Sequence, residues 1–469
     1  MIEKKMDAGL YEINGKASFG KIATIGIQHL LAAIIGVVIP GRVVATAAGL
    51  PPLEIATVIQ MCIIISGIAT LIQVLFGSKL PVVMGTSFGY VPVLTSIVVY
   101  ANELTGGEPN PEAFGILMGA MLVGSLSYLF VGLFMKQLRK FFPAIVTGTI
   151  IFSIGVSLLP VAIRYFAGGG GNPNFGSPQT LFVGFVTFLV VFILNNFGKG
   201  MLSLGSILIA VIVGFLLSLA LGMVDFTTVQ QAPIVALPVP FRFGFQFRIV
   251  PILTMLIMCA ANGMQSVGDL TGLTTSMDRE PTNKELSRGV LSNFVSTILC
   301  SFIGALPTAT FSQNIGLVIT TKVVNKMVFI FTAVVLVLAG LFPPFSAFLG
   351  AIPSAVIGGA IVGIFAMISV TGMKLIASQG FSKRNMSVVG TAIAFGLGIP
   401  MVAANGGTHP LQGLPAQFVN IFGSSMVIIT TILVVILNLV LKEEKQAQTV
   451  EVKQEEVQVS QTELASEQN

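Results

Sequence analysis

The chain has 469 residues, of which 54% are hydrophobic and only 9% are charged, and its mean hydropathy is +0.93. Because soluble domains carry about 25% charged residues, this composition excludes a globular protein with a water-exposed surface. The net charge of +5 is spread over short polar segments and forms no basic block, so nucleic acid is not an expected partner. The three cysteines stand singly in apolar runs, which argues against a disulfide framework or a metal site.

Apolar runs long enough to cross a bilayer recur between residues 21 and 441, which predicts an all-α polytopic membrane protein in a lipid bilayer. Breaks at polar residues, glycines and prolines divide these runs into fourteen transmembrane segments. The segments are centred near residues 30, 65, 90, 123, 153, 188, 211, 260, 298, 315, 336, 364, 392 and 431. The first residues lack the apolar core of a signal peptide, so the first span is expected to direct membrane entry.

Lysine and arginine positions set the expected orientation, because short cytoplasmic loops collect positive charge. With the N-terminus inside, all but four of the 24 basic residues fall in predicted cytoplasmic segments. The four exceptions are Arg42, Arg164, Arg242 and Arg248. Omitting any one span would reverse the side of every later loop, so the pattern predicts fourteen spans with both termini cytoplasmic.

Two segments outside the spans have a distinct composition. The outer loop at residues 225–248 contains an ALPVPFRFGFQF stretch, whose alternation allows a short hairpin on the outer face. Residues 443–469 are rich in Glu, Gln, Lys and Ser and are expected to form a disordered cytoplasmic tail.

The two halves of the chain resemble each other. Residues 143–151 (PAIVTGTII) match residues 353–361 (PSAVIGGAI) at Pro, Val, Gly and Ile, and Gly-Leu-Phe precedes both stretches. A Gly-x-Gln in the first segment recurs in the eighth, and a Leu-Pro that opens the third segment recurs in the tenth. Four correspondences in the same order predict a 7+7 inverted repeat, the architecture of secondary transporters.

The third and tenth segments are the poorest helices of the set. Residues 80–93 (LPVVMGTSFGYVPV) and 306–321 (LPTATFSQNIGLVITT) hold Pro, Gly, β-branched and hydroxyl residues, so both are predicted to be partly non-helical, with short strands. Non-helical backbone at membrane depth must line a cavity or be buried in protein. Interrupted segments at corresponding places in two halves point to a binding site at the midplane, here between residues 86–90 and 312–316.

Few polar side chains lie in the spans. Gln313 and Asn314 each offer an amide donor and acceptor, a pattern that suits the alternating carbonyl and NH edge of a purine or pyrimidine. Phe88 has a ring that can stack on a planar ligand. The alternative is that the two amides only join neighbouring helices, as interhelical amides often do.

Asp269 is the one carboxylate well inside a predicted span, where a charge costs about 2.5 kcal/mol or more, so it is a functional candidate. Gln265 lies four residues earlier, on the same helix face. His29 in the first span titrates near neutrality when unperturbed. Asp269 can instead be a buried helix tether, and His29 can equally be a structural link between helices.

One motif is misleading. Residues 85–89 fit the G-x-S-x-G pattern of hydrolases, but that chemistry needs a strand-to-helix elbow with histidine and acid partners, and the chain has only two histidines. No HExxH motif and no phosphate-binding loop is present in the sequence. The chain is therefore not expected to be an enzyme or to need a cofactor.

Residues 313–322 (QNIGLVITTK) resemble the signature Q/E/P-N-x-G-x4-T-K/R/G of the nucleobase–ascorbate transporters, also called the nucleobase:cation symporter-2 family. The specified positions are Gln313, Asn314, Gly316, Thr321 and Lys322. Gln28-His29, GTSF at 85–88 and SVGDLTG at 266–272 also look like landmarks of this family, and the resemblance covers about residues 20–442. Gln at the first signature position resembles the xanthine and urate branch.

The resemblance implies a core domain and a gate domain, an elevator-like movement of the core, a homodimer and, in bacteria, proton coupling. The implied segments are a cytoplasmic N-terminus (1–20), core parts at 21–135 and 249–348, gate parts at 136–248 and 349–442, and the tail at 443–469. By position, Gln313 would hold the purine edge, Asn314 would order the site, Phe88 would stack and Ser312 would make backbone contacts.

Two positions depart from the family pattern. The Glu that members usually carry in the eighth span is Gln265 here, and the ninth-span position that often holds Asp is Asn293. An amide can bind a purine but cannot carry a proton, so coupling would fall to Asp269, to a histidine or to no residue.

The sequence thus predicts a plasma-membrane purine permease for xanthine, urate or a related oxopurine, working by alternating access, with H⁺ as the coupling ion through Asp269. An uncoupled nucleobase facilitator or exchanger is the alternative within transport. An inorganic-anion transporter of the same inverted-repeat architecture is a further alternative.

Overall fold

A computed structural model describes most of the chain. The described residues are 9–106, 110, 112–138, 142–170, 172–199, 201–404, 409–415, 419, 423 and 425–441. The tail predicted at 443–469 and the first residues of the N-terminal segment 1–20 lie outside them. Within the described ranges, nine helices are long and apolar enough to cross a membrane, or ten if the bent pair α16 and α17 forms one span. The chain is therefore a multi-pass membrane protein.

The helices have the following bounds. The long apolar helices are α2 (Phe19–Ala47), α3 (Pro52–Leu75), the continuous pair α5 (Ala113–Gly124) and α6 (Leu126–Leu133), α8 (Ala144–Phe166), α9 (Pro178–Phe197), α13 (Ile249–Thr275), α14 (Asn283–Ile303), α18 (Ser354–Ala377) and α19 (Lys383–Ala404). The shorter ones are η1 (Gly9–Tyr11), η2 (Phe88–Tyr90), α4 (Val91–Glu103), α7 (Met135–Leu138), α10 (Met201–Leu204), α11 (Ser206–Ala220), α12 (Thr227–Gln231), α15 (Ser312–Thr321), α16 (Lys326–Gly340), α17 (Pro343–Ala351) and α21 (Met426–Val440).

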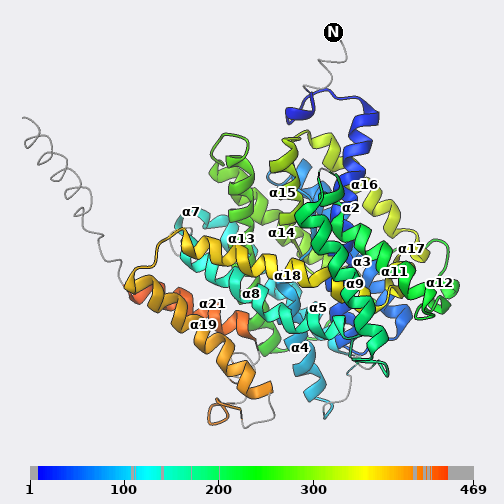
Figure 1. The fold of residues 1–469 in the computed structure, drawn as a ribbon. Helices are drawn as coiled ribbons and strands as arrows, with labels where there is room; N and C mark the ends of the chain where they lie inside the picture. Colours follow the sequence, from blue (N-terminus) through cyan, green and yellow to red (C-terminus); the bar gives the residue numbers. More distant parts are fainter. Residues whose placement is uncertain are drawn as a thin grey trace, which may run out of the picture.

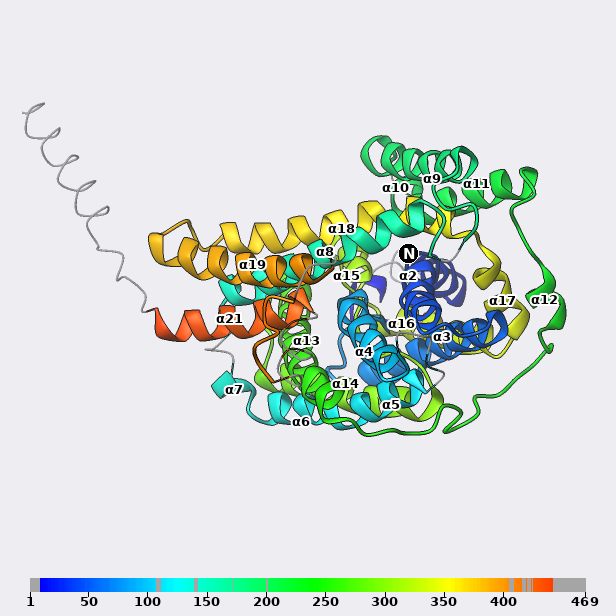
Figure 2. The same ribbon diagram turned by 90° about the horizontal axis from the view of Figure 1, so that it is seen from below.

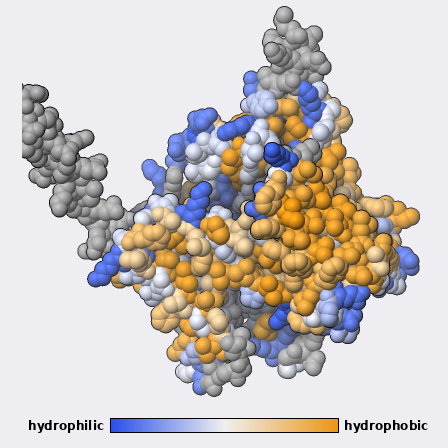
Figure 3. Space-filling model, viewed as in Figure 1, coloured by the Kyte–Doolittle hydropathy of each residue, from blue (hydrophilic) through white to orange (hydrophobic). Residues whose placement is uncertain are grey.

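Helix is the default here because every backbone polar group in lipid must be satisfied within the protein. Local signals fix where helices begin: Pro52 and Pro178 open α3 and α9, where a missing NH costs nothing. Phe182 and Phe185 of α9 are more than half exposed, as expected for side chains that face lipid. Figure 3 shows the resulting broad hydrophobic surface across the middle of the molecule, with hydrophilic residues gathered above and below it.

The helices form two groups. In one, α8 packs against α18 and α21, α9 packs against α11 and α18, and α19 packs against α21. In the other, α3 packs against α2 and α16, α5 against α13, and α6 against α14. Figures 1 and 2 show α8 and α18 crossing the molecule side by side. In Figure 2, α3, α5 and α14 lie on the opposite side, and α15 lies between the two groups.

The contact between α8 and α18 is built from glycines. A Cβ atom at Gly358 would lie 2.0 Å from the backbone nitrogen of Phe166, and one at Gly372 would lie 2.3 Å from that of Phe152. The two helices run antiparallel, since the later residue of α18 faces the earlier residue of α8. Small residues let helix backbones approach closely in a membrane, where no hydrophobic force drives helices together.

Two strands of three residues each interrupt the helical pattern. Strands β1 (Met84–Thr86) and β2 (Thr308–Thr310) pair antiparallel, with Met84 opposite Thr310 and Thr86 opposite Thr308. Each strand leads into a helix, β1 into η2 and α4, and β2 into α15. The strands lie in the segments that the sequence marks as the poorest helices, and both are fully buried.

The hairpin allowed by residues 225–248 is wrong: this loop holds the short helix α12 and none of the strands in the described ranges. Prolines interrupt the alternating stretch, and proline cannot donate to a strand ladder. The loop is instead fastened to α14 and α5 of the second helix group. The Phe241 NH donates to the Phe302 carbonyl at 2.7 Å, and the Gln246 NH donates to the Gly115 carbonyl at 2.9 Å.

Replacing Gly358 by alanine is expected to destabilise the α8–α18 contact by about 1–3 kcal/mol, because the new methyl group would overlap the backbone of α8. The thermal unfolding midpoint of the detergent-solubilised protein measures the effect. Gly363→Ala on the same helix is the matched control, since its nearest neighbour would be Val191 Cγ1 at 4.0 Å. Equal midpoints for the two variants would contradict this packing.

Candidate functional site

The centre of the molecule is the crossing of the two interrupted segments. The β1–β2 ladder is extended at both ends by the Ser87 NH, which donates to the Pro307 carbonyl at 3.2 Å, and by the Phe311 NH, which donates to the Val83 carbonyl at 3.0 Å. Because the strands are antiparallel, α4 and α15 leave the crossing in opposite directions. Thus η2 and α15 both begin beside the same strand pair. The first turn of α15 presents backbone NH groups there, whereas at the start of α4 the Val91 NH donates to the Phe88 carbonyl and Pro92 has no NH.

Thr70 and Ser296 hold the outer edges of the strand pair. The Thr70 hydroxyl of α3 accepts the Met84 NH at 2.8 Å, and the Thr308 hydroxyl donates to Ser296 of α14 at 2.9 Å. The Thr86 hydroxyl donates to the Val37 carbonyl of α2 at 2.5 Å. Hydroxyl side chains therefore satisfy polar groups that lipid cannot, which explains why these segments are rich in threonine and serine.

Asp269 of α13 is bound to the start of α15. Its carboxylate accepts hydrogen bonds from the Thr310 hydroxyl at 2.5 Å and from the Ser312 hydroxyl at 3.1 and 3.3 Å. Hydrogen bonds to an ionised acceptor are stronger than those between neutral groups. The predicted site residues Asp269 and Ser312 thus lie together, and the carboxylate fastens β2 and α15 to α13.

Gln265 lies at the end of a chain of hydrogen bonds. The Tyr90 and Tyr128 hydroxyls contact each other, Tyr128 donates to Asn262 Oδ1 at 2.7 Å, and Asn262 Nδ2 donates to Gln265 Oε1 at 3.5 Å. Both tyrosines are fully buried. This chain joins η2, α6 and α13, so the position of Gln265 is coupled to that of the first interrupted segment.

His29 and Asn314 form a buried pair between α2 and α15. Asn314 Nδ2 donates to the His29 carbonyl at 3.0 Å and lies 3.1 Å from His29 Nδ1. Because an amide nitrogen only donates, Nδ1 acts as the acceptor and the ring proton is assigned to Nε2. The His29 ring also packs against Phe329, with centroids 4.7 Å apart. The pair fixes α15 to α2, and the Asn314 amide nitrogen is fully used in doing so.

Asn293 lies on α14, one turn before Ser296. It is fully buried between α14 and α13, where its Nδ2 donates to Ser266 Oγ at 2.8 Å. Ser266 follows Gln265 directly, so Asn293 supports the helix that carries Gln265.

Phe88 is 5% exposed, and its ring meets Phe365 of α18 edge-to-face with centroids 5.0 Å apart. It is therefore a contact between the two helix groups. Gln313 occupies the first turn of α15, next to Ser312, but its side chain lies outside the described part of the structure. Gly316, one turn later, is exposed, and a Cβ atom there would meet nothing within 4 Å.

Thr321 and Lys322 end α15. Lys322 adopts a left-handed conformation with φ 59°, and its Nζ donates to the Ser276 carbonyl at 2.9 Å. Ser276 caps the C-terminal end of α13, where a cation is favoured by the helix dipole. The Thr321 hydroxyl donates back to the Leu317 carbonyl at 2.8 Å. Lys322 therefore anchors the far end of α15 to α13, whereas Thr321 bonds within α15.

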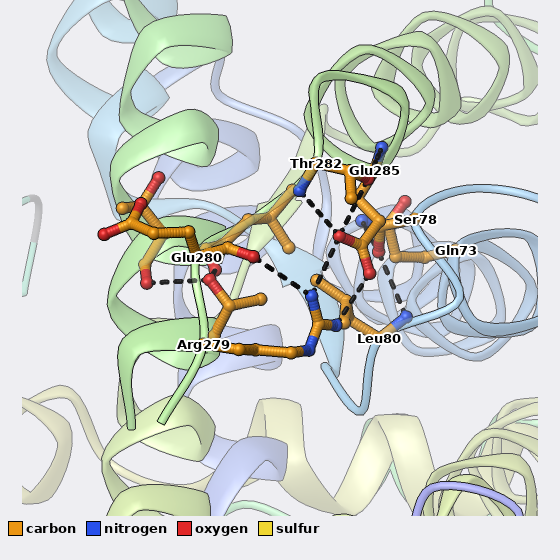
Figure 4. A network of polar contacts seen from close by, with 10 residues as sticks. Gln73, Ser78, Leu80, Arg279, Glu280, Thr282 and Glu285 are labelled. Carbon is orange, nitrogen blue, oxygen red and sulfur yellow. Dashed lines mark hydrogen bonds and ion pairs between the residues drawn. The ribbon is translucent and has the colours of Figure 1, made fainter. Parts of the chain in front are cut away.

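The turn between α13 and α14 is held by the polar network of Figure 4. Arg279 and Glu285 form an ion pair at 2.7 Å, and Glu285 also accepts the Thr282 NH at 2.8 Å in a capping box. Next to it, Gln73 Nε2 at the end of α3 donates to Ser78 Oγ at 3.1 Å. The network fixes the antiparallel pairing of α13 and α14, and with it the orientation of the α13 face that carries the site.

Three residues with contacts at the site were not predicted from the sequence, namely Thr310, Tyr128 and Asn262, while Tyr90 ends the predicted stretch 86–90. The chain has only five tyrosines, and a tyrosine inside a span needs a partner for its hydroxyl, which is a signal that was available. Asn262 stands three residues before Gln265, on the same helix face. Thr310 carried no signal of its own, because its role depends on the strand register.

Chemically, the site offers one carboxylate, one amide held by a hydrogen-bond chain and the first turn of α15. Within the described ranges, no three His, Cys, Asp or Glu side chains lie close enough to hold a metal ion. The arrangement suits a neutral, planar, polar molecule that exchanges hydrogen bonds with amides and backbone NH groups.

Tyr128→Phe is expected to destabilise the protein by about 1–3 kcal/mol, because the buried Asn262 Oδ1 would lose its donor. The measurement is the thermal unfolding midpoint in detergent. Tyr100→Phe on α4 is the control, since Tyr100 is only half-buried. An unchanged midpoint in Tyr128→Phe would contradict the importance of the hydrogen-bond chain.

Comparison with known sequences identifies the family. Residues 20–405 match the Permease family. The chain is 34% identical over 390 residues to the xanthine permease of Bacillus subtilis, with 82% of this chain and 86% of the relative covered. It is 32% identical over 402 residues to the xanthine permease XanQ of Escherichia coli, with 83% and 86% covered. It is 31% identical over 396 residues to the uric acid permease PucJ of Bacillus subtilis, with 82% and 85% covered.

Solved structures show the same fold at low sequence identity. The transmembrane domain of the cyanobacterial bicarbonate transporter BicA aligns with a TM-score of 0.59 at 16% identity, covering 91% of this chain and 99% of that domain. The murine anion transporter Slc26a9 in its inward-facing state aligns with a TM-score of 0.59 at 14% identity, covering 89% and 68%. Together with the signature at residues 313–322, the sequence matches establish that the chain is a transporter, not an enzyme, and that it belongs to the Permease family of xanthine and uric acid permeases.

Proposed function

We propose that the protein transports purine nucleobases, namely xanthine, urate or a related oxopurine, into the cell across the plasma membrane. The observation that carries this proposal is the hydrogen-bonded junction of Asp269 with Thr310 and Ser312, which joins the signature helix α15 to the α13 face that carries Gln265. The names of the relatives at 31–34% identity support the purine substrate class.

The amides divide into two roles in this proposal. Gln265 and Gln313 bind the purine, because a primary amide can pair with adjacent carbonyl and NH groups on its edge. Asn314 orders the site instead, since its amide nitrogen is already donated to His29. Phe88 stacks on the purine ring from the boundary with α18, where it now meets Phe365. Ser312 contributes backbone contacts at the start of α15.

Proton coupling is assigned to Asp269. As a carboxylate it accepts bonds from both Thr310 and Ser312, whereas a protonated acid has a proton to donate and one oxygen fewer to accept with. Protonation therefore weakens the junction between α13 and α15, which links proton and substrate binding. His29 is assigned a structural role, because its Nδ1 and carbonyl already face Asn314.

The proposed mechanism is elevator-type alternating access by a homodimer. The core comprises 21–135 and 249–348 and the gate comprises 136–248 and 349–442, a division that agrees with the packing of the two helix groups. The proposed fourteen segments in a 7+7 inverted repeat correspond to the nine long helices together with α11, α16, α21, β1–α4 and β2–α15. The β1–β2 pair would be the place where the two repeats meet.

Cytoplasmic termini are part of the proposal. Asn14, Lys79, Glu285 and Lys326 come from four separate predicted cytoplasmic segments, and all four line one pocket of about 370 Å³. Their gathering at one end of the molecule supports a common side for these segments. The lysines there agree with the positive-inside tendency.

The test of function is uptake of radiolabelled xanthine into a host that lacks its own purine transporters, with unlabelled nucleobases as competitors. Saturable uptake that xanthine or urate suppresses, and that a protonophore reduces, is expected. No competition by any nucleobase would overturn the assignment. Chloride or sulfate flux that excess xanthine leaves unchanged would favour an inorganic-anion transporter.

Asp269→Asn is expected to abolish the pH dependence of uptake and to limit the internal substrate to the external concentration, because the amide cannot carry a proton. Wild-type uptake should rise as the external pH falls, since external protons then load Asp269. Asp278→Asn is the control, because Asp278 lies exposed in a left-handed turn with φ 56°, which asparagine accepts.

The uncoupled facilitator is the second candidate, and the neutral Gln265 and Asn293 favour it. It requires pH-independent uptake in the wild type and no effect of Asp269→Asn. Under that outcome, Gln265→Glu should introduce a pH dependence that the wild type lacks.

A further inference from the structure

The N-terminal residues 9–16 fold back onto the link between α15 and α16, and we name them the clasp. The backbone NH groups of Val324 and Asn325 donate to the Leu10 carbonyl at 3.0 and 3.1 Å, and the Lys326 NH donates to the Ile13 carbonyl at 3.0 Å. Leu10 is buried, with 6% of its surface exposed. The clasp is therefore an ordered part of the fold.

Asn325 is the hub of this contact. It is fully buried, its Oδ1 accepts the Met327 NH at 2.9 Å to cap α16, and its Nδ2 donates to the Gly9 and Gly15 carbonyls at 2.7 Å each. Only a side chain with both an acceptor and a two-proton donor on a short stem can make these three bonds. The same residue thus begins α16 and closes the clasp.

Two glycines let the clasp close on itself. A Cβ atom at Gly9 would lie 2.1 Å from the Lys16 carbonyl oxygen, and one at Gly15 would lie 2.3 Å from the Gly9 carbonyl oxygen. Both contacts are to backbone, so no side-chain rotation could relieve them. The carbonyls that Asn325 binds are presented only when this loop is closed.

The clasp lies at the far end of the helix that carries the signature. Asn325 stands three residues after Lys322, which ends α15 and is tied to the Ser276 carbonyl at 2.9 Å. A helix of ten residues is a stiff rod of about 15 Å. Its first turn holds Ser312 and Asn314, so a shift at the α15–α16 link moves the candidate substrate site.

We propose that the clasp and Asn325 position α15 and thereby set the affinity of the substrate site. Asn325 is a positioning residue that acts through α15 and does not touch the substrate. The inference rests on the proposed function for the identity of the substrate, but the coupling between clasp and α15 is a property of the protein without any substrate.

Two variants open the clasp from opposite sides. Asn325→Asp keeps the cap of α16 and the side-chain volume but removes the donors to the Gly9 and Gly15 carbonyls. Gly15→Ala disrupts the loop by overlap with the Gly9 carbonyl. Gly20→Ala is the matched control, because a Cβ atom there meets nothing within 4 Å.

Each opening variant is expected to raise the KM for xanthine uptake about tenfold, with the maximal rate per transporter nearly unchanged. The double variant should add little to either single variant, because both remove the same interaction. Gly20→Ala should behave as the wild type. An unchanged KM in both opening variants would overturn the proposal.

Hydrogen exchange of the α15 amides, measured without substrate, gives an independent readout. Faster exchange across Ser312–Thr321 in both opening variants, with α8 and α18 still protected, is expected. A general loss of protection that includes α8 and α18 would show a purely structural role and reject the inference. If the wild type took up no purine, the proposed function would fail while this exchange experiment would still decide on the clasp.

Discussion

The antiparallel pairing of β1 with β2 is the interaction on which the rest of the structure depends. Two stretches of backbone leave the helical state in the buried interior of the protein, where an unpaired NH or carbonyl is costly. Each satisfies the other, the Thr70 hydroxyl accepts the Met84 NH at the edge, and the Thr86 hydroxyl ties the pair to the Val37 carbonyl of α2. The pairing also brings the starts of two half-helices to one place, which creates a polar site in an otherwise apolar protein.

The surrounding helices hold this junction through a few specific polar contacts. Asp269 binds the start of α15, His29 binds Asn314, and Lys322 binds the end of α13. Each of these bonds joins α15 to a different helix or to a different end of the same helix. The signature residues Asn314 and Lys322 therefore anchor one short helix to its neighbours.

Much of the architecture followed from the chain alone. The composition determined the membrane setting, the apolar runs located the long helices, and the hydroxyl-rich stretches at 80–93 and 306–321 marked the segments that contain β1 and β2. The loop at 225–248 was less predictable. Its alternation resembles a hairpin, but its prolines and its hydrogen bonds to α14 and α5 give it another conformation. Asn325 gave no signal, since its partners lie more than 300 residues away in the N-terminal clasp.

The sequence by itself determined the family, the apolar helices and a short set of candidate polar residues. A lipid environment excludes most backbone conformations other than the helix, and polar side chains are rare within apolar spans, so each one stands out. Only the tertiary structure decided what those residues do. Asp269 accepts bonds from two hydroxyls, and Asn314 donates to His29. Asn293 donates to Ser266, and Phe88 packs against Phe365. These roles depend on which groups meet across helices far apart in the chain, and hydrogen-bond partners at such separations leave no periodicity in the sequence.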